Sequence, residues 1–406
     1  EQHLQQCHAP CVLDPVMSAS AGGSFLASGA GAAYEHLLPH CDIVTPNREE
    51  AAQLAQQPFD QLENAPAIGE RILARGAKAV LLKGGHFASE FAADYFTDGE
   101  QRVWIIQHRR QSDNTRGTGC ALSSSIASAL AMGYSLLDAI VIAKMAVDEA
   151  IQNSYATADA PAIQGPINCT AFPSRSESLP MLIPHREELS DLPWREAPWL
   201  KQEFPHCGPT PIGLYPVVDS SDWLARLLPL GVSTIQLRMK SGSEGDIENE
   251  IIRSIAIAKQ YNARLFINDH WQLAIELGCD WLHLGQEDLD EADVDAIRAA
   301  GLKLGISTHD RAELDRSLAL NPDYVALGPV YPTILKNMKW HQQGLEKLTE
   351  WKQIIGDIPL IAIGGMSVDR AQGAFDAGAD VVSAVTDITL NDAPEDRVRE
   401  WLRATS

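Results

Sequence analysis

Short strand-like runs alternate with stretches of helical periodicity in the first part of the chain. The runs lie at residues 11–16, 42–46 and 79–83 and end at turn residues such as Thr45-Pro46-Asn47. Apolar residues at helical spacing follow at residues 48–56, 68–75, 121–132 and 136–153. Because strands that alternate with helices are typical of α/β proteins, the pattern predicts an α/β domain over residues 1–164.

Prolines interrupt this alternation in the middle of the chain. Ten of the 23 prolines fall between Pro161 and Pro211. Such a density prevents long regular elements, because proline lacks the backbone N–H and fixes φ. We therefore expect residues 165–211 to form a proline-rich linker between two domains.

The alternation resumes after Pro211 as eight strand–helix units. The predicted strands are residues 214–219, 234–240, 264–269, 281–285, 303–308, 324–330, 359–365 and 381–386. Eight βα units in a segment of this length fit a compact TIM (β/α)8 barrel, which we expect over residues 212–406. A doubly wound sheet is the structural alternative.

The acidic composition narrows the range of partners. The chain has 54 Asp and Glu against 32 Lys and Arg, which gives a formal net charge of −22. A nucleic-acid backbone is bound by clustered basic residues, so we expect no nucleic-acid partner. A small phosphorylated substrate stays compatible with this charge, since a few local cations and a metal ion suffice to bind it.

The sequence shows neither a signal peptide nor a membrane-spanning segment. The most apolar stretch, residues 126–147, contains Asp138 and Lys144 and has the periodicity of a core helix. The seven cysteines include no Cys-x-x-Cys pair, as is usual for reduced thiols in a cytosolic protein. We therefore expect a cytoplasmic protein without a membrane partner, and a homo-oligomer stays open. The chain starts at Glu1 inside an apparent βα unit, so we expect a fragment or a trimmed protein.

Polar side chains gather at the ends of the predicted barrel strands, where TIM barrels carry their active sites. On the second strand, alternation places Gln236, Arg238 and Lys240 on one side. Two cations and an amide that point into a barrel are costly without an anionic ligand, so we expect an anion site. Alternation at the surface is the other interpretation.

Two carboxylates face this basic strand from adjacent strand ends. Asp269 ends the third strand, and Asp288 follows the fourth. A few oxygen ligands, completed by the substrate, suit Mg²⁺ beside a pyrophosphate. Each Asp could also be a plain helix N-cap, an alternative that applies most to Asp269 because a helix follows it.

The seventh and eighth strands end in small or hydroxylated residues. Gly364-Gly365 ends strand seven, and Val385-Thr386 ends strand eight. The loops after these strands commonly bind phosphate through backbone N–H groups, which glycine allows to approach closely. We therefore expect a second phosphate site there. A role of the glycine pair in packing alone is the alternative.

Six segments of the second domain form a specific combination. They are Gln236-x-Arg238-x-Lys240, Phe266-Ile267-Asn268-Asp269, His283-Leu284-Gly285-Gln286-Glu287-Asp288-Leu289, Gly305-x-Ser307-Thr308-His309, Gly328-Pro329-x-Tyr331-Pro332-Thr333 with Lys336, and Ala362-Ile363-Gly364-Gly365. In this order they resemble thiamine-phosphate synthase. The resemblance implies condensation of a hydroxymethylpyrimidine pyrophosphate with a thiazole phosphate to thiamine phosphate, with release of pyrophosphate. A tautomerase-like barrel that only binds or isomerises thiazole phosphate is the alternative, but it needs neither the basic strand nor the two Asp.

The resemblance also implies roles for individual residues. The pyrimidine pyrophosphate would be held by Gln236, Leu237, Arg238, Met239, Lys240, Asn268, Ser307 and Lys336. The thiazole phosphate would be held by Thr333, Ile334, Leu335, Gly365, Val385 and Thr386. Asp269 and Asp288 would bind Mg²⁺, and the catalytic cations would be Arg238, Lys240 and Lys336. They would stabilise the negative charge that grows on the departing pyrophosphate.

Two positions depart from the family pattern on the thiazole side. The family usually reads Pro-Thr-x-Thr-Lys after strand six, where this chain has Leu335 in place of the second Thr. The pair after strand eight usually ends in Ser, where this chain has Thr386, which keeps a hydroxyl. The first change removes a hydroxyl, so we expect it to affect thiazole phosphate binding.

The first domain carries four segments of another family. They are Leu13-Asp14-Pro15-Val16-Met17, Thr45-Pro46-Asn47-x-x-Glu50-Ala51, Leu82-Lys83-Gly84-Gly85-His86 and Asn114-Thr115-Arg116-Gly117-Thr118-Gly119-Cys120. They resemble the C-terminal part of a ribokinase-like hydroxymethylpyrimidine (phosphate) kinase. Lys83, Gly117, Thr118 and Gly119 would bind the phosphates of ATP, and Cys120 takes the catalytic position. Because Gly117 to Cys120 open a helix, free N–H groups would form an anion hole, although a plain helix cap is the alternative.

The kinase family's N-terminal half has no counterpart in these residues. That half carries a glycine-rich substrate segment and several central strands. We therefore expect a partial kinase domain that is a poor or inactive kinase, fused to a complete synthase. A further hypothesis makes this first segment a structural partner without catalysis.

Overall fold

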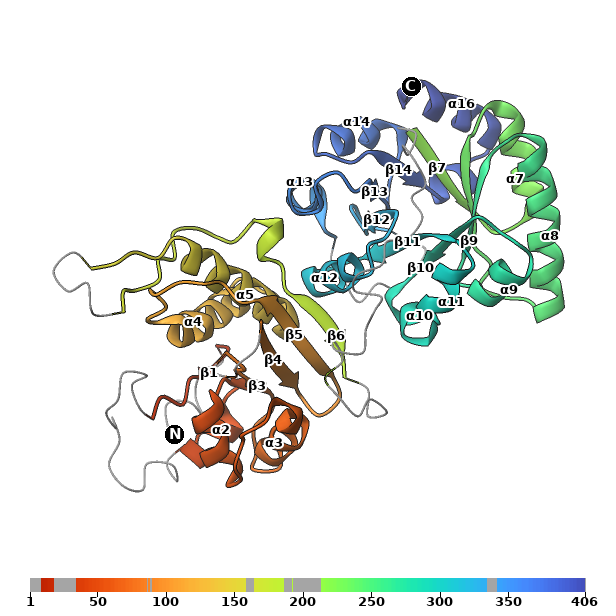
Figure 1. Cartoon of the computed structure of the whole chain (residues 1–406). Coiled ribbons are helices and arrows are strands. Elements are labelled where there is room, and N and C mark those ends of the chain that lie inside the picture. The colour runs from red at the N-terminus through yellow and green to blue at the C-terminus, as the bar shows by residue number, and fades with distance from the viewer. Residues whose placement is uncertain are drawn as a thin grey trace. The chain divides into compact units, whose positions relative to one another are not determined.

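The computed structural model describes residues 9–17, 34–85, 87, 90–157, 164–185, 192, 213–333 and 342–405. The chain divides into two compact units, Glu1–Pro198 and Trp199–Ser406 (Figure 1). Both units mix strands and helices, which confirms the predicted α/β class. Among the described residues, no helix has both the length and the apolar character that crossing a bilayer requires.

The first unit is built on a mixed sheet of six strands in sequence order. The strands are β1 (Val12–Leu13), β2 (Ile43–Val44), β3 (Val80–Leu82), β4 (Phe91–Thr97), β5 (Arg102–His108) and β6 (Met181–Pro184). The first three strands are parallel, and the last three join antiparallel. The helices packed with this sheet are α2 (Arg48–Ala55), α3 (Ala65–Leu73), α4 (Thr118–Ala131) and α5 (Leu136–Gln152). The strand–helix alternation predicted for this domain is present.

Two parts of the sheet were not predicted. The hairpin of β4 and β5 falls on residues for which the pattern indicated no element. β6 lies within the predicted linker, yet it pairs with β5, with Ile106 opposite Met181. The linker prediction was therefore wrong up to Pro184, because three or four apolar residues suffice to extend a sheet even between prolines at its ends.

The second unit is a closed barrel of eight parallel strands. They are β7 (Gly213–Val218), β8 (Thr234–Leu237), β9 (Arg264–Asn268), β10 (Trp281–Leu284), β11 (Lys303–Thr308), β12 (Tyr324–Leu327), β13 (Leu360–Ala362) and β14 (Val381–Ala384), and β14 closes on β7. This confirms the TIM barrel and excludes the doubly wound sheet. Several strands end earlier than predicted. β8 stops at Leu237, so Arg238 and Lys240 lie in the loop that follows.

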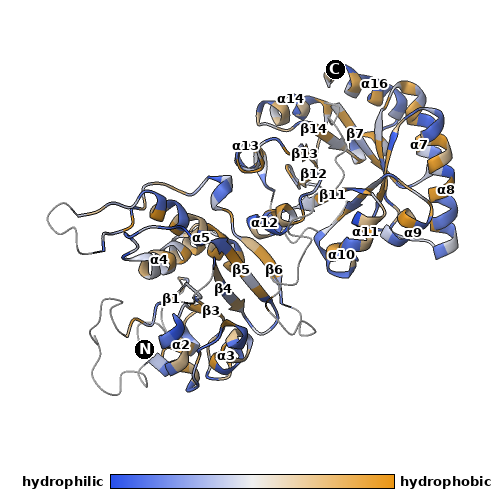
Figure 2. Cartoon of the chain, in the orientation of Figure 1, coloured by the Kyte–Doolittle hydropathy of each residue, from blue (hydrophilic) through white to orange (hydrophobic). Residues whose placement is uncertain are grey.

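Helices surround the barrel in the expected alternation. They are α7 (Ser221–Leu227), α8 (Glu244–Gln260), α9 (Trp271–Glu276), α10 (Gln286–Glu291), α11 (Val294–Ala299), α12 (Arg311–Ala319), α13 (Gly344–Ile355), α14 (Val368–Asp376), α15 (Thr386–Thr389) and α16 (Pro394–Ala404). Hydrophilic and hydrophobic residues alternate along them, as helices with one buried face require (Figure 2).

The barrel interior holds a cluster of aromatic and aliphatic side chains. Its members are Tyr215, Phe266, Tyr324, Ala326, Ile361 and Val381. Gly305 on β11 makes room for one of them, because a Cβ at that position would lie 2.0 Å from the ring of Tyr324. The glycine of this strand therefore determines where the Tyr324 ring sits.

Candidate active site

Charged side chains of three strand ends meet at the carboxyl end of the barrel strands. Lys240, after β8, forms an ion pair with Asp269, after β9. The carboxyl group of Asp288, on α10 after β10, lies within hydrogen-bonding reach of Asp269. Burial, together with this neighbouring carboxyl group, raises the pKa of Asp288. We call these three residues the Asp269 cluster, and the structure brings them together as the sequence predicted.

The backbone of Asp269 adopts an unusual conformation. Its φ of 66° lies in the left-handed region, which Asp tolerates better than most residues. Its N–H donates to the carbonyl oxygen of His283 at 3.0 Å, which ties the end of β9 to β10. The N-cap of α9 is His270, so the helix-cap interpretation of Asp269 is wrong. Asp288 does make a capping contact, since it accepts the N–H of Gly285 at 3.1 Å.

Two carboxyl groups in contact are suited to a divalent cation. The described residues contain no group of three or more His, Cys, Asp or Glu side chains arranged around one point. Mg²⁺ does not need such a group, because it binds through one or two carboxylates and takes its other ligands from substrate phosphates and water. Burial and the contact with Asp269 raise the pKa of Asp288, and the charge of Lys240 opposes this rise. The residues present therefore fit the predicted magnesium ion.

Asn268 presents a buried donor beside this cluster. The residue is 4% exposed, and its Nδ2 finds no hydrogen-bond partner among the described residues. A buried amide without a partner is unfavourable, and such groups in native proteins commonly mark a ligand or water position. The end of β9 thus offers an unsatisfied donor next to Asp269.

A chain of hydrogen bonds runs through the barrel interior from Gln236 to Ser307. Gln236 Nε2 donates to the Tyr215 hydroxyl at 3.0 Å, and that hydroxyl lies 3.1 Å from the Tyr324 hydroxyl. The Tyr324 hydroxyl is 2.7 Å from Nδ1 of His283, whose Nε2 is 2.8 Å from Ser307 Oγ. We call these five residues the interior chain. Burial, and secondarily the charge of Arg238, lowers the pKa of His283 to about 3, so its ring is uncharged.

Sequence reasoning assigned the two ends of the interior chain and missed its middle. Gln236 and Ser307 were predicted substrate residues, whereas Tyr215, Tyr324 and His283 received no role. The available signal was a polar side chain inside a strand that is otherwise apolar. His283 belongs to one of the six segments that resemble thiamine-phosphate synthase, but its hydrogen-bond partners lie 24 and 41 residues away along the chain.

The other predicted pyrimidine-side residues differ in exposure. Arg238 is half-buried, and its N–H donates to the carbonyl oxygen of Val218 at 2.7 Å. Leu237 is buried in the core. Met239 is half-buried, and its carbonyl oxygen lies 3.1 Å from Nε2 of His270. Of these three, Arg238 carries a charged side chain, and its charge acts on His283 together with those of Asp288 and Lys240.

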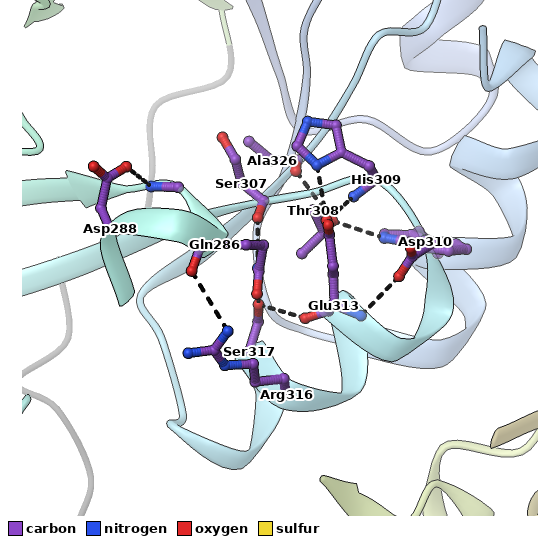
Figure 3. Close-up of polar contacts among 12 residues, drawn as sticks. Gln286, Asp288, Ser307, Thr308, His309, Asp310, Glu313, Arg316, Ser317 and Ala326 are labelled. Atoms are coloured by element: carbon purple, nitrogen blue, oxygen red, sulfur yellow. Dashed lines mark hydrogen bonds and ion pairs between the residues drawn. The ribbon is translucent and has the colours of Figure 1, made fainter. Parts of the chain in front are cut away.

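Polar contacts fix the loop after β11 around Ser307 (Figure 3). Gln286 Nε2 donates to the carbonyl oxygen of Ser307 at 2.8 Å and to Ser317 Oγ at 3.0 Å. Glu313 accepts the N–H of His309 at 2.8 Å and contacts its Nδ1 at 2.7 Å. Ser307 is therefore held through its backbone as well as its hydroxyl.

The glycine pair after β13 packs tightly against the loop after β12. Gly364 and Gly365 have φ values of 90° and 64°. A Cβ on Gly365 would lie 2.5 Å from the carbonyl oxygen of Pro332, so only glycine fits. The packing role of the pair is thus real, and it places Gly365 beside the segment that ends in Thr333. Thr333 is half-buried, whereas Ile334, Leu335 and Lys336 lie outside the described residues.

The residues after β14 open a short helix. Val385 is the N-cap of α15, and Thr386 is its first residue. Val385 and Thr386 follow the strand next to β13, which carries the glycine pair. The predicted thiazole-side residues of the described part thus come from neighbouring loops after β12, β13 and β14.

In the first unit, the side chain of Lys83 lies close to groups from three other segments of the chain. Its Nζ lies 3.0 Å from Asp14 Oδ1 and 3.9 Å from Glu50 Oε2. A Cβ on Gly119 would be 3.4 Å from the same nitrogen. Burial, and then the Asp14 carboxylate, raises the pKa of the Cys120 thiol. The structure brings Lys83, Gly119 and Cys120 together as predicted, and Asp14 and Glu50 are the members that received no role.

Helix α4 begins beside Lys83 without a side-chain cap. Its N-cap is Gly117, which has a φ of 95° and makes no capping hydrogen bond. The first N–H groups of α4 therefore have no partner from a capping side chain, as an anion site at a helix start requires. The plain helix-cap interpretation is not favoured by this geometry.

Both units match models of known protein families. Residues 214–388 match the family model for thiamine monophosphate synthase, and residues 1–168 match that for phosphomethylpyrimidine kinase. A thiamine-phosphate synthase of Rhizobium etli is 55% identical over 192 residues, which are 47% of this chain and 94% of that protein. One of Serratia proteamaculans is 49% identical over 198 residues, or 49% of this chain and 90% of that protein.

Two solved structures match parts of the chain. A thiamine phosphate pyrophosphorylase from Pyrococcus furiosus matches with a TM-score of 0.43 and 23% identity, over 48% of this chain and 95% of that one. A pyridoxal kinase from Staphylococcus aureus in complex with AMP-PCP matches with a TM-score of 0.37 and 29% identity. That match covers 41% of this chain and 60% of the kinase.

The second unit is thus a barrel enzyme whose rim carries lysine and carboxylate side chains. The chain belongs to the thiamine-phosphate synthase family, and its place is in thiamine biosynthesis. It also contains a phosphomethylpyrimidine kinase-like domain. The alternative of a tautomerase-like barrel without synthase activity is not favoured.

Proposed function

We propose that the synthase reaction takes place over the Asp269 cluster, at the carboxyl ends of β8 to β11. The observation that supports this most directly is the meeting of Lys240, Asp269 and Asp288 beside the unsatisfied amide of Asn268. A pyrophosphate with its Mg²⁺ would satisfy all of these groups at once. The predicted residues Gln236 and Ser307 would hold the rest of the pyrimidine substrate from the interior of the barrel.

Bond cleavage would leave negative charge on the departing pyrophosphate. Lys240 and Arg238 would stabilise this charge, and Asn268 Nδ2 would donate to a phosphate oxygen. Asp269 and Asp288 would hold Mg²⁺, which when bound neutralises the charge of pyrophosphate oxygens. Gly365, Thr333 and the Val385-Thr386 pair would hold the thiazole phosphate so that its nitrogen faces the methylene carbon. Lys336, Ile334 and Leu335, which would also contact the substrates, lie outside the described residues.

The test is an assay of the purified chain with Mg²⁺, pyrimidine pyrophosphate and thiazole phosphate. We expect thiamine phosphate and pyrophosphate in equal amounts. Isomerisation of the thiazole substrate without release of pyrophosphate would support the tautomerase alternative and overturn the assignment.

The unsatisfied amide of Asn268 leads to a first prediction. Asn268→Ala should weaken binding of the pyrimidine pyrophosphate about tenfold, the value of one hydrogen bond to a charged group. The free energy of unfolding should stay unchanged, because the amide Nδ2 has no partner among the described residues. Binding is measured by titration calorimetry and stability by urea unfolding. Asn249, exposed on α8, supplies the control Asn249→Ala, and equal affinity of both variants would contradict the prediction.

We further propose that the first unit binds the phosphates of ATP at Lys83 and the start of α4. Lys83 and the N–H groups that follow Gly117 supply positive charge from two sides. Cys120, whose raised thiol pKa keeps it protonated, would face the transferring phosphoryl group. Phosphorylation of a pyrimidine phosphate is the reaction that this site would serve, with Asp14 and Glu50 as its acidic members.

The start of α4 allows a test by charge alone. Thr118→Asp should favour the helix, since a carboxylate stabilises a helix N-terminus, yet it should repel ATP phosphates. We expect at least about tenfold weaker binding of MgATP in calorimetry, whereas the isosteric Thr118→Asn should bind almost as the unmodified chain does. Equal binding by the two variants would show that ATP phosphates do not lie there. A chain that binds no MgATP at all would favour a structural partner without catalysis.

A further inference from the structure

We propose that Tyr324, assisted by Tyr215, is a positioning residue for the synthase reaction, which orders the interior chain so that the Ser307 hydroxyl donates to the pyrimidine pyrophosphate. The inference rests on the proposed assignment of Ser307 to this substrate. It assigns a function to two tyrosines that are buried inside the barrel.

The interior chain connects five of the eight strands. Its members come from β8, β7, β12, β10 and β11, in the order Gln236, Tyr215, Tyr324, His283 and Ser307. The four members before Ser307 are buried, with exposures of 3%, 2%, 1% and 7%. Water therefore cannot readily replace a lost member, and each hydrogen bond depends on its neighbours.

The atoms at one end of the interior chain fix the direction of its first hydrogen bond. An amide nitrogen can only donate, so Gln236 Nε2 donates to the Tyr215 hydroxyl. In the proposed order, the Tyr215 hydroxyl donates to the Tyr324 hydroxyl, and the Tyr324 hydroxyl donates to Nδ1 of His283. An uncharged imidazole that accepts at Nδ1 carries its proton at Nε2, so it donates to Ser307 Oγ. The proton of Ser307 remains for an acceptor outside the chain.

An acceptor of this kind is what the substrate offers. Pyrophosphate oxygens and ring nitrogens accept hydrogen bonds, and a hydroxyl that is fixed as a donor needs no reorientation when they arrive. The backbone of Ser307 is held as well, because its carbonyl oxygen accepts from Gln286 at 2.8 Å. The barrel also fixes the position of Tyr324, because Gly305 leaves the space that the ring of Tyr324 fills.

The test is a double-mutant cycle of Tyr324→Phe and Ser307→Ala. Each single variant should lower kcat/KM for the pyrimidine pyrophosphate about tenfold, as expected for one hydrogen bond to a charged group, with KM for thiazole phosphate unchanged. In the Ser307→Ala background, Tyr324→Phe should cause no further loss. Tyr215→Phe should reproduce the effect of Tyr324→Phe and serves as the second variant if the latter folds poorly.

A packing control separates positioning from structure. Phe266 lies edge-on against Tyr324 at 5.3 Å between ring centroids and makes no hydrogen bond through its side chain. Phe266→Leu should lower the midpoint of urea unfolding while kcat/KM stays within about twofold. Additive losses in the cycle, or unchanged kcat/KM in Tyr324→Phe, would overturn the positioning role. Unchanged kcat/KM in Ser307→Ala would overturn it together with the assignment of Ser307 to the substrate.

Discussion

Replacing Asp269 by Asn should reduce the turnover of thiamine phosphate synthesis by about 10²–10³, a loss typical of a deleted electrostatic contact in an active site. Asn is a better replacement than Ala at this position. Asp269 has a φ of 66°, and Asn tolerates this left-handed conformation whereas Ala does not. Asn keeps the shape of the side chain and removes the charge that Mg²⁺ requires. Asp288→Asn should have a similar effect, measured as kcat in a pyrophosphate-release assay.

The fold should survive both changes. Burial and the neighbouring carboxyl group of Asp269 raise the pKa of Asp288, so removing one charge relieves repulsion in the absence of metal. We expect unfolding in urea and EDTA at an unchanged or higher midpoint. Asp290 is largely exposed and pairs with Arg316 on the same side of the barrel, so Asp290→Asn is the matched control. Full activity of either site variant, or of the unmodified chain in EDTA, would refute the metal assignment.

Replacing Lys240 by Ala should lower kcat by about 10²-fold, because the charge that this lysine contacts grows during bond cleavage. Its ion pair with Asp269 places the ammonium group at the proposed pyrophosphate position. Lys240→Arg keeps the charge and should retain more activity than Lys240→Ala. Arg238→Ala should resemble Lys240→Ala in direction.

Whether Lys240→Ala changes kcat or KM decides which role Lys240 has in the reaction. A rise in KM with constant kcat would mean that the lysine binds ground state and transition state equally well. Lys259, exposed near the end of α8, provides the control Lys259→Ala, which changes the net charge of the protein by the same amount. Equal losses in both lysine variants would point to a general charge effect rather than a contact.

The barrel could be predicted strand by strand, because parallel strands buried on both faces form continuous apolar runs between helices. The Asp269 cluster followed from the same pattern, since neighbouring strand ends meet at one rim. The interior chain could not be predicted in this way. Its central bond joins Tyr215 to Tyr324 across 109 residues, and a polar atom within a strand says nothing of its partner.

The first unit was harder to predict for related reasons. β1 and β2 have two residues each, so the longer strand-like runs predicted there include loop residues on both sides of the strands. The hairpin of β4 and β5 has aromatic and polar residues on both strands, which obscures the alternation. β6 is short and ends at Pro184, and composition alone placed it in a linker.

The position of β6 affects how the chain can be synthesised and divided. The outer edge of β5 is paired along four residues by β6, which leaves the ribosome more than seventy residues after β5 itself. Until then the growing polypeptide presents an open strand edge, which can pair with another nascent chain. A gene cut after codon 164 would remove β6 and make that exposure permanent. A cut after codon 185 would keep β6 with its sheet.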